Sequence, residues 1–98
     1  MIIETKTINP NIFNHQYWIK EIDPEVIKVT FETILIQSGF KIVKFDDYYF
    51  PVKGYTCFWL LAESHLAIHT FPDDQCSYVE LSSCNEEKLS VFKSLIQQ

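Results

Sequence analysis

The chain has 98 residues and a formal net charge of −5 at pH 7, so a single domain over residues 1–98 is expected. It contains no cluster of lysine and arginine, which argues against a nucleic-acid-binding protein, and no apolar run near the roughly 20 residues that a membrane span needs. Hydrophobic residues make up 47% of the chain and aromatic residues 15%. Either the core is rich in aromatic residues or a partner subunit covers part of this apolar surface, and we expect the second, as in a homodimer.

The N-terminal part of the chain predicts one strand. Residues 1–11 end in Asn9-Pro10-Asn11 and fit either a short strand or a loose arm. They lack the basic and then apolar segments of a signal peptide, so a cytoplasmic location is the default expectation. In residues 12–22, the alternation of Phe13, His15, Tyr17 and Ile19 indicates a strand.

A helix is predicted next. Asp23 is a good N-cap and Pro24 fits the first helical position, while Gly39 gives a stop after about Ser38. The stretch is rich in β-branched residues and partly fits a strand period of two, but its length and both end signals favour a helix. One face carries Ile27, Phe31, Ile34 and Leu35, and the opposite face carries Val29 and Ile36 as a second contact surface.

Four strands and a second helix follow in the sequence. Strands are expected over residues 41–49, 56–62, 65–71 and 76–84, with a break at 51–54 and a turn at 72–75. Asn85 caps a final helix whose stripe holds Leu89, Phe92 and Ile96. Short turns between successive strands imply antiparallel pairing. The order β-α-β-β-β-β-α therefore predicts an α+β two-layer sandwich with both helices on one face of an antiparallel sheet.

The predicted hairpin brings chemically useful side chains together. If residues 72–75 form a four-residue loop, Phe71 faces Cys76 and Cys84 falls opposite Glu63, beside Ser64. His69 lies on the same strand, five residues after Ser64. We therefore expect a serine, a histidine and a cysteine to converge near one strand end.

Residue chemistry alone leaves simpler interpretations open. Ser64 is also a common type of turn residue, and His65 and His69 also fit as ordinary residues of a strand. Their HxxxH spacing matches a metal pair only on a helix, and there is no apparent third ligand, so no metal is expected. A serine hydrolase is disfavoured because no GxSxG motif is present. Three cysteines (Cys57, Cys76 and Cys84) without CxxC spacing argue against a disulfide framework.

Residues 61–72, LAESHLAIHTFP, resemble the signature of the short prokaryotic pyruvoyl-dependent S-adenosylmethionine decarboxylases. That signature is an ESH tripeptide, a leucine, an apolar strand and then His-Thr-aromatic-Pro. Cys84 lies at the family's spacing from the serine. The upstream residues Phe50, Pro51, Gly54 and Thr56 resemble the preceding segment of the family, and the resemblance covers roughly residues 13–98.

The resemblance implies a role for each of these residues. The chain would cleave itself between Glu63 and Ser64, and Ser64 would become a pyruvoyl cofactor that forms a Schiff base with the substrate amine. His69 would help to remove the α-proton of residue 64 during processing, with support from Thr56. Cys84 would donate a proton to the product, which a largely protonated thiol is able to do.

The implied substrate is S-adenosylmethionine, and the implied pathway is polyamine and spermidine biosynthesis. Phe50 and Phe71 would flank the adenine, while Asp73 would bind the ribose hydroxyls. Family sites are shared across a homodimer, which agrees with the excess of apolar surface.

The sequence also departs from the family pattern. Asp73 replaces a glutamate, Thr56 replaces a serine, and Cys57 and Asn85 stand where glycines are usual. Two alternatives follow: a pyruvoyl decarboxylase of ornithine or arginine, and a non-processing homologue that acts as a binding or regulatory partner.

Overall fold

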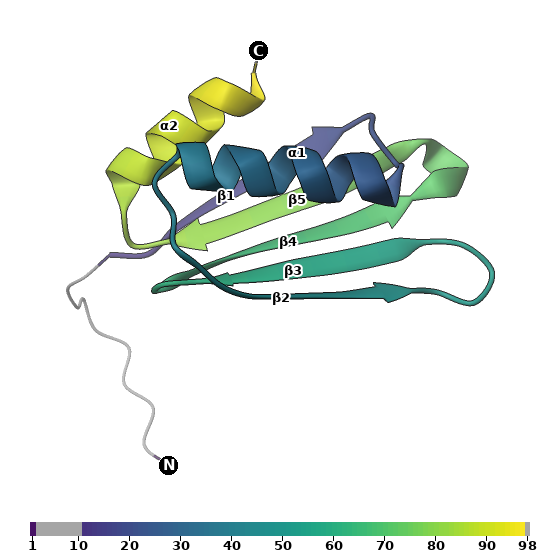
Figure 1. Ribbon diagram of the computed structural model, residues 1–98, viewed down its shortest axis with the longest axis horizontal. Coiled ribbons are helices and arrows are strands. Elements are labelled where there is room, and N and C mark those ends of the chain that lie inside the picture. The colour runs from purple at the N-terminus through teal and green to yellow at the C-terminus, as the bar shows by residue number, and fades with distance from the viewer. Residues whose placement is uncertain (2–10, 98) are drawn as a thin grey trace.

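The computed structural model describes residue 1 and residues 11–97. The expectation for residues 1–11 therefore lies almost wholly outside the described residues. The sheet has five strands in the order β1-β5-β4-β3-β2, and every neighbouring pair is antiparallel (Figure 1). The elements are β1 (Phe13–Ile19), α1 (Pro24–Gln37), β2 (Ile42–Tyr49), β3 (Tyr55–Leu61), β4 (Ser64–Phe71), the 3-10 turn η1 (Pro72–Asp74), β5 (Cys76–Ser83) and α2 (Glu86–Ile96).

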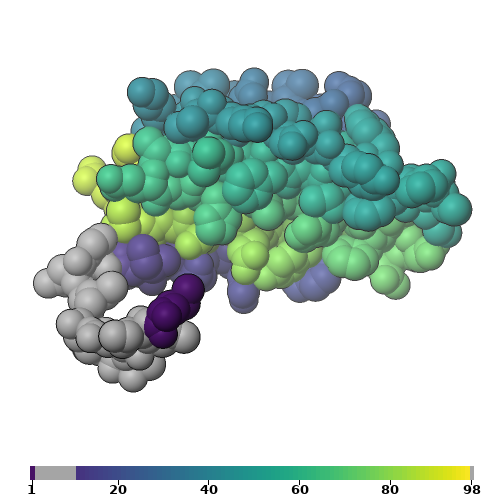
Figure 2. Space-filling model, turned by 90° about the horizontal axis from the view of Figure 1, so that it is seen from below, coloured from purple at the N-terminus to yellow at the C-terminus, as the bar shows by residue number. Residues whose placement is uncertain are grey.

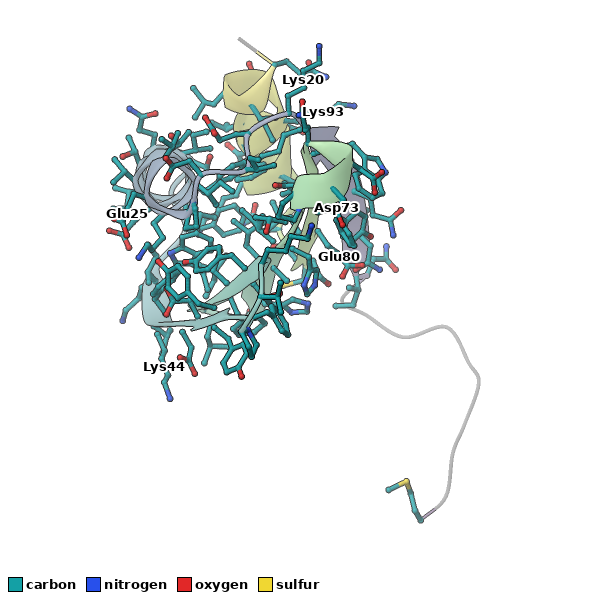
Figure 3. The ribbon with its side chains drawn as sticks, turned by 90° about the vertical axis from the view of Figure 1, so that its right-hand side faces the viewer. Lys20, Glu25, Lys44, Asp73, Glu80 and Lys93 are labelled. Carbon is teal, nitrogen blue, oxygen red and sulfur yellow. The ribbon has the colours of Figure 1, made fainter. Side chains whose placement is uncertain are left out.

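Both helices lie on the same face of the sheet (Figure 3). The predicted α+β two-layer architecture and the order of its elements are therefore confirmed. Within the described part of the chain, no helix is long and apolar enough to cross a membrane.

Helix α1 begins and ends as its sequence predicts. The Asp23 carboxylate accepts hydrogen bonds from the backbone N–H groups of Glu25 (2.9 Å) and Val26 (3.4 Å), which satisfies two donors that the helix leaves unpaired. At the other end, Gly39 has a φ of +90°, a conformation that glycine adopts without steric cost. The helix prediction is thus confirmed over the alternative of a strand.

The core lies between the two helices and one face of the sheet. Alternate residues of each strand point toward the helices, as in β3, where Tyr55, Cys57, Trp59 and Leu61 are buried. The predicted helical faces supply the other side of the core through Ile27, Phe31, Leu35, Leu89 and Phe92. Val29 and Ile36 lie on the outer side of α1, with exposed fractions of 67% and 61%.

The other face of the sheet, here called the open face, is not covered by either helix in the described residues. Lys44 and Glu80 project on this side, away from the helices (Figure 3). Seen from below, side chains of the middle of the chain, in teal and green, form most of the visible surface (Figure 2). Several large apolar side chains of this face are exposed: Trp18, Tyr48, Phe58, Leu60 and Phe71.

The predicted register of β4 against β5 is confirmed. Phe71 pairs with Cys76, and Ser64 pairs with Ser83. The connection between these strands is a 3-10 turn that Gln75 closes with a left-handed φ of 51°, so it keeps the four-residue length on which the register depends. Strand β1 is shorter than predicted, because residues 20–22 leave the sheet to reach the cap of α1.

Candidate functional site

The turn between β3 and β4 is strained at one residue. Leu61 pairs with Ser64, so Ala62 and Glu63 form a two-residue turn. Glu63 has a φ of 60°, in the left-handed region where a Cβ atom crowds the following carbonyl oxygen at a cost of about 1–2 kcal/mol. The strain therefore lies at the residue that precedes Ser64.

Ser64 is the first residue of β4, and its side chain points toward the helices. Its exposed fraction is only 9%. The Ser64 hydroxyl donates a hydrogen bond to Ser83 Oγ over 2.6 Å. Ser83 Oγ also accepts a hydrogen bond from the backbone N–H of Asn85 over 3.0 Å. Two hydroxyl groups and the start of α2 are thus joined next to the strained turn.

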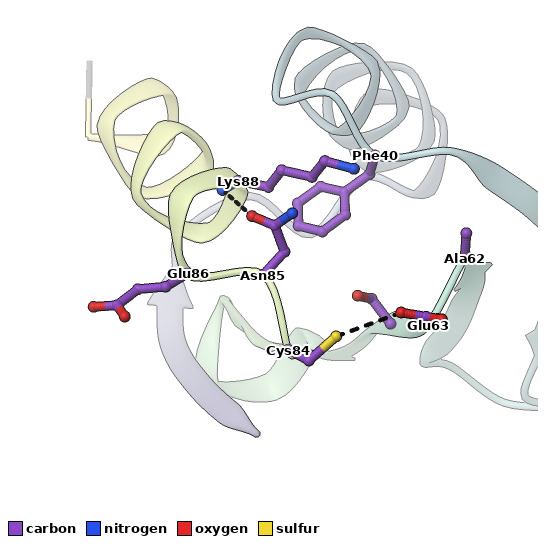
Figure 4. Close-up of a pocket in the computed structure, with 8 residues that line it drawn as sticks. Phe40, Ala62, Glu63, Cys84, Asn85, Glu86 and Lys88 are labelled. Atoms are coloured by element: carbon purple, nitrogen blue, oxygen red, sulfur yellow. Dashed lines mark hydrogen bonds between the residues drawn. The ribbon is translucent and has the colours of Figure 1, made fainter. Parts of the chain in front are cut away.

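Cys84 reaches the same turn from the end of β5. Its thiol donates to the Glu63 carboxylate over 3.7 Å, as the predicted register requires. A pocket of about 460 Å³ opens here (Figure 4), and we call it the Ser64 pocket. It is lined by Phe40, Ala62, Glu63, Ser64, Cys84, Asn85, Glu86 and Lys88.

His69 does not join Ser64 and Cys84 within one chain, so the expected convergence of all three residues is wrong. At about 3.3 Å per residue, the five steps from Ser64 to His69 span roughly 16 Å. An odd number of steps also puts the two side chains on opposite faces of the strand. His69 therefore lies on the open face, nearer the other end of β4.

His69 instead belongs to a second group of residues. Its Nδ1 lies 2.9 Å from Thr56 Oγ1 on β3, and its ring stacks on Tyr78 of β5 with 6.4 Å between centroids. The hydroxyl of Thr56 limits how the imidazole can rotate. The contact therefore fixes the orientation of the imidazole ring on the open face.

The three residues predicted to bind substrate do come together. Phe50, Phe71 and Asp73 line a pocket of about 350 Å³ beside η1 and the β2–β3 hairpin, together with Lys53 and other residues. The Lys53 ammonium donates to the Asp73 carboxylate. Lys53 was missed in the sequence, since no local pattern links it to a carboxylate twenty residues away.

The two groups lie at opposite ends of the sheet. Ser64 and Cys84 belong to the end where β4 begins and β5 finishes. Thr56, His69 and the pocket around Asp73 belong to the end where β3 begins and β4 finishes. One chain therefore holds Ser64 and His69 at separate ends of its sheet.

Among the described residues, no three His, Cys, Asp or Glu side chains are grouped so that they hold a metal ion. Cys57 is also chemically different from Cys84, because it is completely buried in the core and burial raises the pKa of its thiol to about 12. The Ser64 pocket is lined by the Ser64 hydroxyl and by the thiol of Cys84, which is only partly buried.

Comparison with known proteins gives a consistent result. The family model described as S-adenosylmethionine decarboxylase matches residues 2–98. An S-adenosylmethionine decarboxylase proenzyme of Prochlorococcus marinus (strain MIT 9313) is 30% identical over 67 residues, which cover 68% of this chain and 54% of the relative. A proenzyme of the same name from Geobacillus sp. (strain WCH70) is 32% identical over 62 residues, or 63% of this chain and 50% of the relative.

A solved structure is similar as well. The adenosylmethionine decarboxylase from Aquifex aeolicus VF5 superimposes with a TM-score of 0.64 at 26% sequence identity. The match covers 74% of this chain and 60% of that chain. The present chain spans about half the length of the curated relatives that it matches.

Proposed function

Because the chain belongs to the S-adenosylmethionine decarboxylase family, we propose that it is a self-processing proenzyme that decarboxylates S-adenosylmethionine for polyamine and spermidine biosynthesis. One observation carries this proposal. A buried serine at a strained turn shares a pocket with a cysteine thiol, which is the arrangement that backbone cleavage and later proton delivery at one position require.

The proposed cleavage uses groups that the chain itself provides. The Ser64 hydroxyl attacks the carbonyl carbon of Glu63, the peptide bond breaks, and an ester joins the two residues. A histidine then removes the α-proton of residue 64, so that the ester is eliminated. This elimination releases fragment 1–63 as a carboxylate and leaves a dehydroalanine at residue 64. Its hydrolysis releases ammonia and leaves a fragment 64–98 that begins with a pyruvoyl group. The strain at Glu63 favours the first step, because the turn relaxes when the peptide bond breaks.

The Ser64 pocket fits the group that processing would create. A pyruvoyl ketone supplies an electron sink that binds the substrate amine and accepts charge as carbon dioxide leaves. Residue 64 already lies at the wall of the pocket. Cys84 lines the same pocket, so its thiol is positioned to deliver a proton to the product.

We further propose that the enzyme is a homodimer whose open faces pack together. Each chain carries Ser64 and Cys84 at one end of its sheet and His69, Thr56 and Asp73 at the other. In such an isologous interface, a two-fold axis that runs across the strands brings the His69 end of one sheet over the Ser64 end of the other. The exposed fraction of Trp18, 65% on the open face, supports burial of this face in the dimer.

The substrate is tested by measuring carbon dioxide released from carboxyl-labelled S-adenosylmethionine, ornithine and arginine in separate assays. We expect release from S-adenosylmethionine only, and none from a Ser64→Ala control. The shorter Asp73 and its pairing with Lys53 are the features that favour a different substrate. Release from ornithine or arginine in place of S-adenosylmethionine would overturn the proposed specificity.

A further inference from the structure

We propose that Ser83 is a positioning residue for self-cleavage, because it holds the Ser64 hydroxyl ready for attack on Glu63. The inference rests on the proposed cleavage between residues 63 and 64 and adds a residue to it. Its starting point is the short hydrogen bond from Ser64 to Ser83 Oγ.

The contact between the two serines is buried and well defined. Ser64 and Ser83 are paired neighbours on β4 and β5, and the exposed fraction of Ser83 is 1%. Their 2.6 Å separation is at the short end of the range for hydroxyl groups. Because Ser83 is shielded from solvent, little water competes for this bond.

Ser83 is itself fixed by the chain around it. The backbone N–H of Asn85 donates to Ser83 Oγ, while Asn85 caps α2 by accepting from the N–H of Lys88 over 3.0 Å. The position of the Ser83 oxygen is thus set by the beginning of a helix. A hydroxyl held in this way acts as a rigid acceptor.

Such an acceptor orients the attacking oxygen. In the first step a bond forms between Ser64 Oγ and the carbonyl carbon of Glu63, and the bond from that carbon to the nitrogen of residue 64 breaks. The proton from Ser64 Oγ ends on the new amine. When this proton points to Ser83, the lone pairs of Ser64 Oγ remain available for the carbonyl carbon. Without Ser83, the hydroxyl rotates among several staggered positions, and fewer molecules are ready to react.

The test compares Ser83→Ala with Ser83→Thr by following cleavage of freshly purified full-length chain with intact-mass spectrometry. Loss of one neutral hydrogen bond predicts cleavage about three- to tenfold slower for Ser83→Ala. Ser83→Thr keeps the hydroxyl and is expected to stay within about twofold of the wild type. If Ser83 has only a structural role, the rate of cleavage is expected to fall in step with the melting temperature of each variant.

A second measurement isolates the first step. In a His69→Ala background the ester accumulates and hydroxylamine splits it, so the yield of split chain over time reports ester formation. Adding Ser83→Ala to this background is expected to slow ester formation by the same factor as it slows cleavage. This comparison does not use Ser83→Thr, so it holds even if that variant folds poorly. If the wild type cleaves but the ester forms at the same rate with and without the Ser83 hydroxyl, the role of Ser83 is overturned and the proposed function is not. A wild type that never cleaves overturns the proposed function and this inference with it.

Discussion

His69 is the residue whose position differs most from the expectation drawn from the sequence. It lies on the open face beside Thr56, roughly 16 Å along the strand from Ser64. As the proposed acceptor of the α-proton, it acts after the ester has formed. This order of events gives a direct test.

Replacing His69 by alanine is expected to stop processing at the ester. The chain then keeps its full-length mass, but hydroxylamine splits it between residues 63 and 64. His65→Ala is the matched control, since His65 lies on the same strand and the same face, and its cleavage is expected to proceed as in the wild type. A pyruvoyl fragment formed at the wild-type rate by His69→Ala would exclude a role for His69.

Cys57 gives a prediction about pH. Burial raises the pKa of its thiol from 9.0 to about 12, so the folded protein holds this proton more tightly than the unfolded chain. This difference contributes fully to the free energy of unfolding below about pH 9, and the contribution is lost as the pH rises through about 12. The pKa of Tyr55 is raised as well, mainly by burial and secondly by the hydrogen bond that its hydroxyl donates to Asp47. Titration of Tyr55 therefore adds to the loss of stability above pH 10.

We therefore expect the free energy of unfolding, measured in urea, to fall steadily between pH 9 and 11. The fall is expected to be shallower in Cys57→Ala, whatever the stability of that variant at pH 7. Identical slopes in the two proteins would mean that the Cys57 thiol titrates alike in the folded and unfolded chains.

The sequence predicts some of these residues and not others. The contact of Cys84 with Glu63 followed from a hairpin register, which depends only on the length of one loop. The separation of His69 from Ser64 was implicit in their odd spacing on a strand. The pairing of Lys53 with Asp73 depends on how two hairpins lie side by side, and no short-range pattern encodes that.

At the level of elements, α1 shows how end signals overcome an ambiguous interior. Its β-branched residues have low intrinsic helix propensity, yet the helix runs from Pro24 to Gln37. The Asp23 cap and the burial of Ile27, Phe31 and Leu35 compensate for that propensity. The type of such an element is predictable from these signals. The observed ends of β1 and β4 differ from the predicted ends by one to three residues, because they depend on local turn geometry.

The cap of α1 makes a measurable contribution to stability. Asp23→Ala removes the acceptor for the N–H groups of Glu25 and Val26, and we expect the free energy of unfolding in urea to fall by about 1 kcal/mol. Asp23→Asn keeps a capping oxygen and is expected to lose only a small part of this. If both variants lose the same amount, the charge of Asp23 and not its capping bond is responsible.

At the scale of the whole molecule, the separation of Ser64 from His69 within one chain supports the proposed homodimer. If each site takes Ser64 from one chain and His69 from the other, a mixed dimer of two inactive variants contains one complete site. The open face, with its exposed Trp18, Phe58 and Phe71, supplies the apolar area for such a dimer. The dimer expected from composition stays a prediction, and composition does not predict its face, because the face depends on which side of the sheet the helices cover.

Mixing Ser64→Ala with His69→Ala under conditions that exchange subunits is therefore expected to restore cleavage. Only the His69→Ala chain becomes cleaved, because it alone carries Ser64, and intact-mass spectrometry identifies it. Each variant incubated alone serves as the control. If mixed dimers form and no chain is cleaved, His69 does not act on the partner's Ser64.

The most direct test of self-processing is the intact mass of the purified wild-type chain after prolonged incubation. Self-processing predicts two species, fragment 1–63 and fragment 64–98 with a pyruvoyl group in place of its first serine, while Ser64→Ala stays at full length. A single uncleaved mass for the wild type, unchanged with time, would contradict self-processing and favour a homologue that only binds a partner.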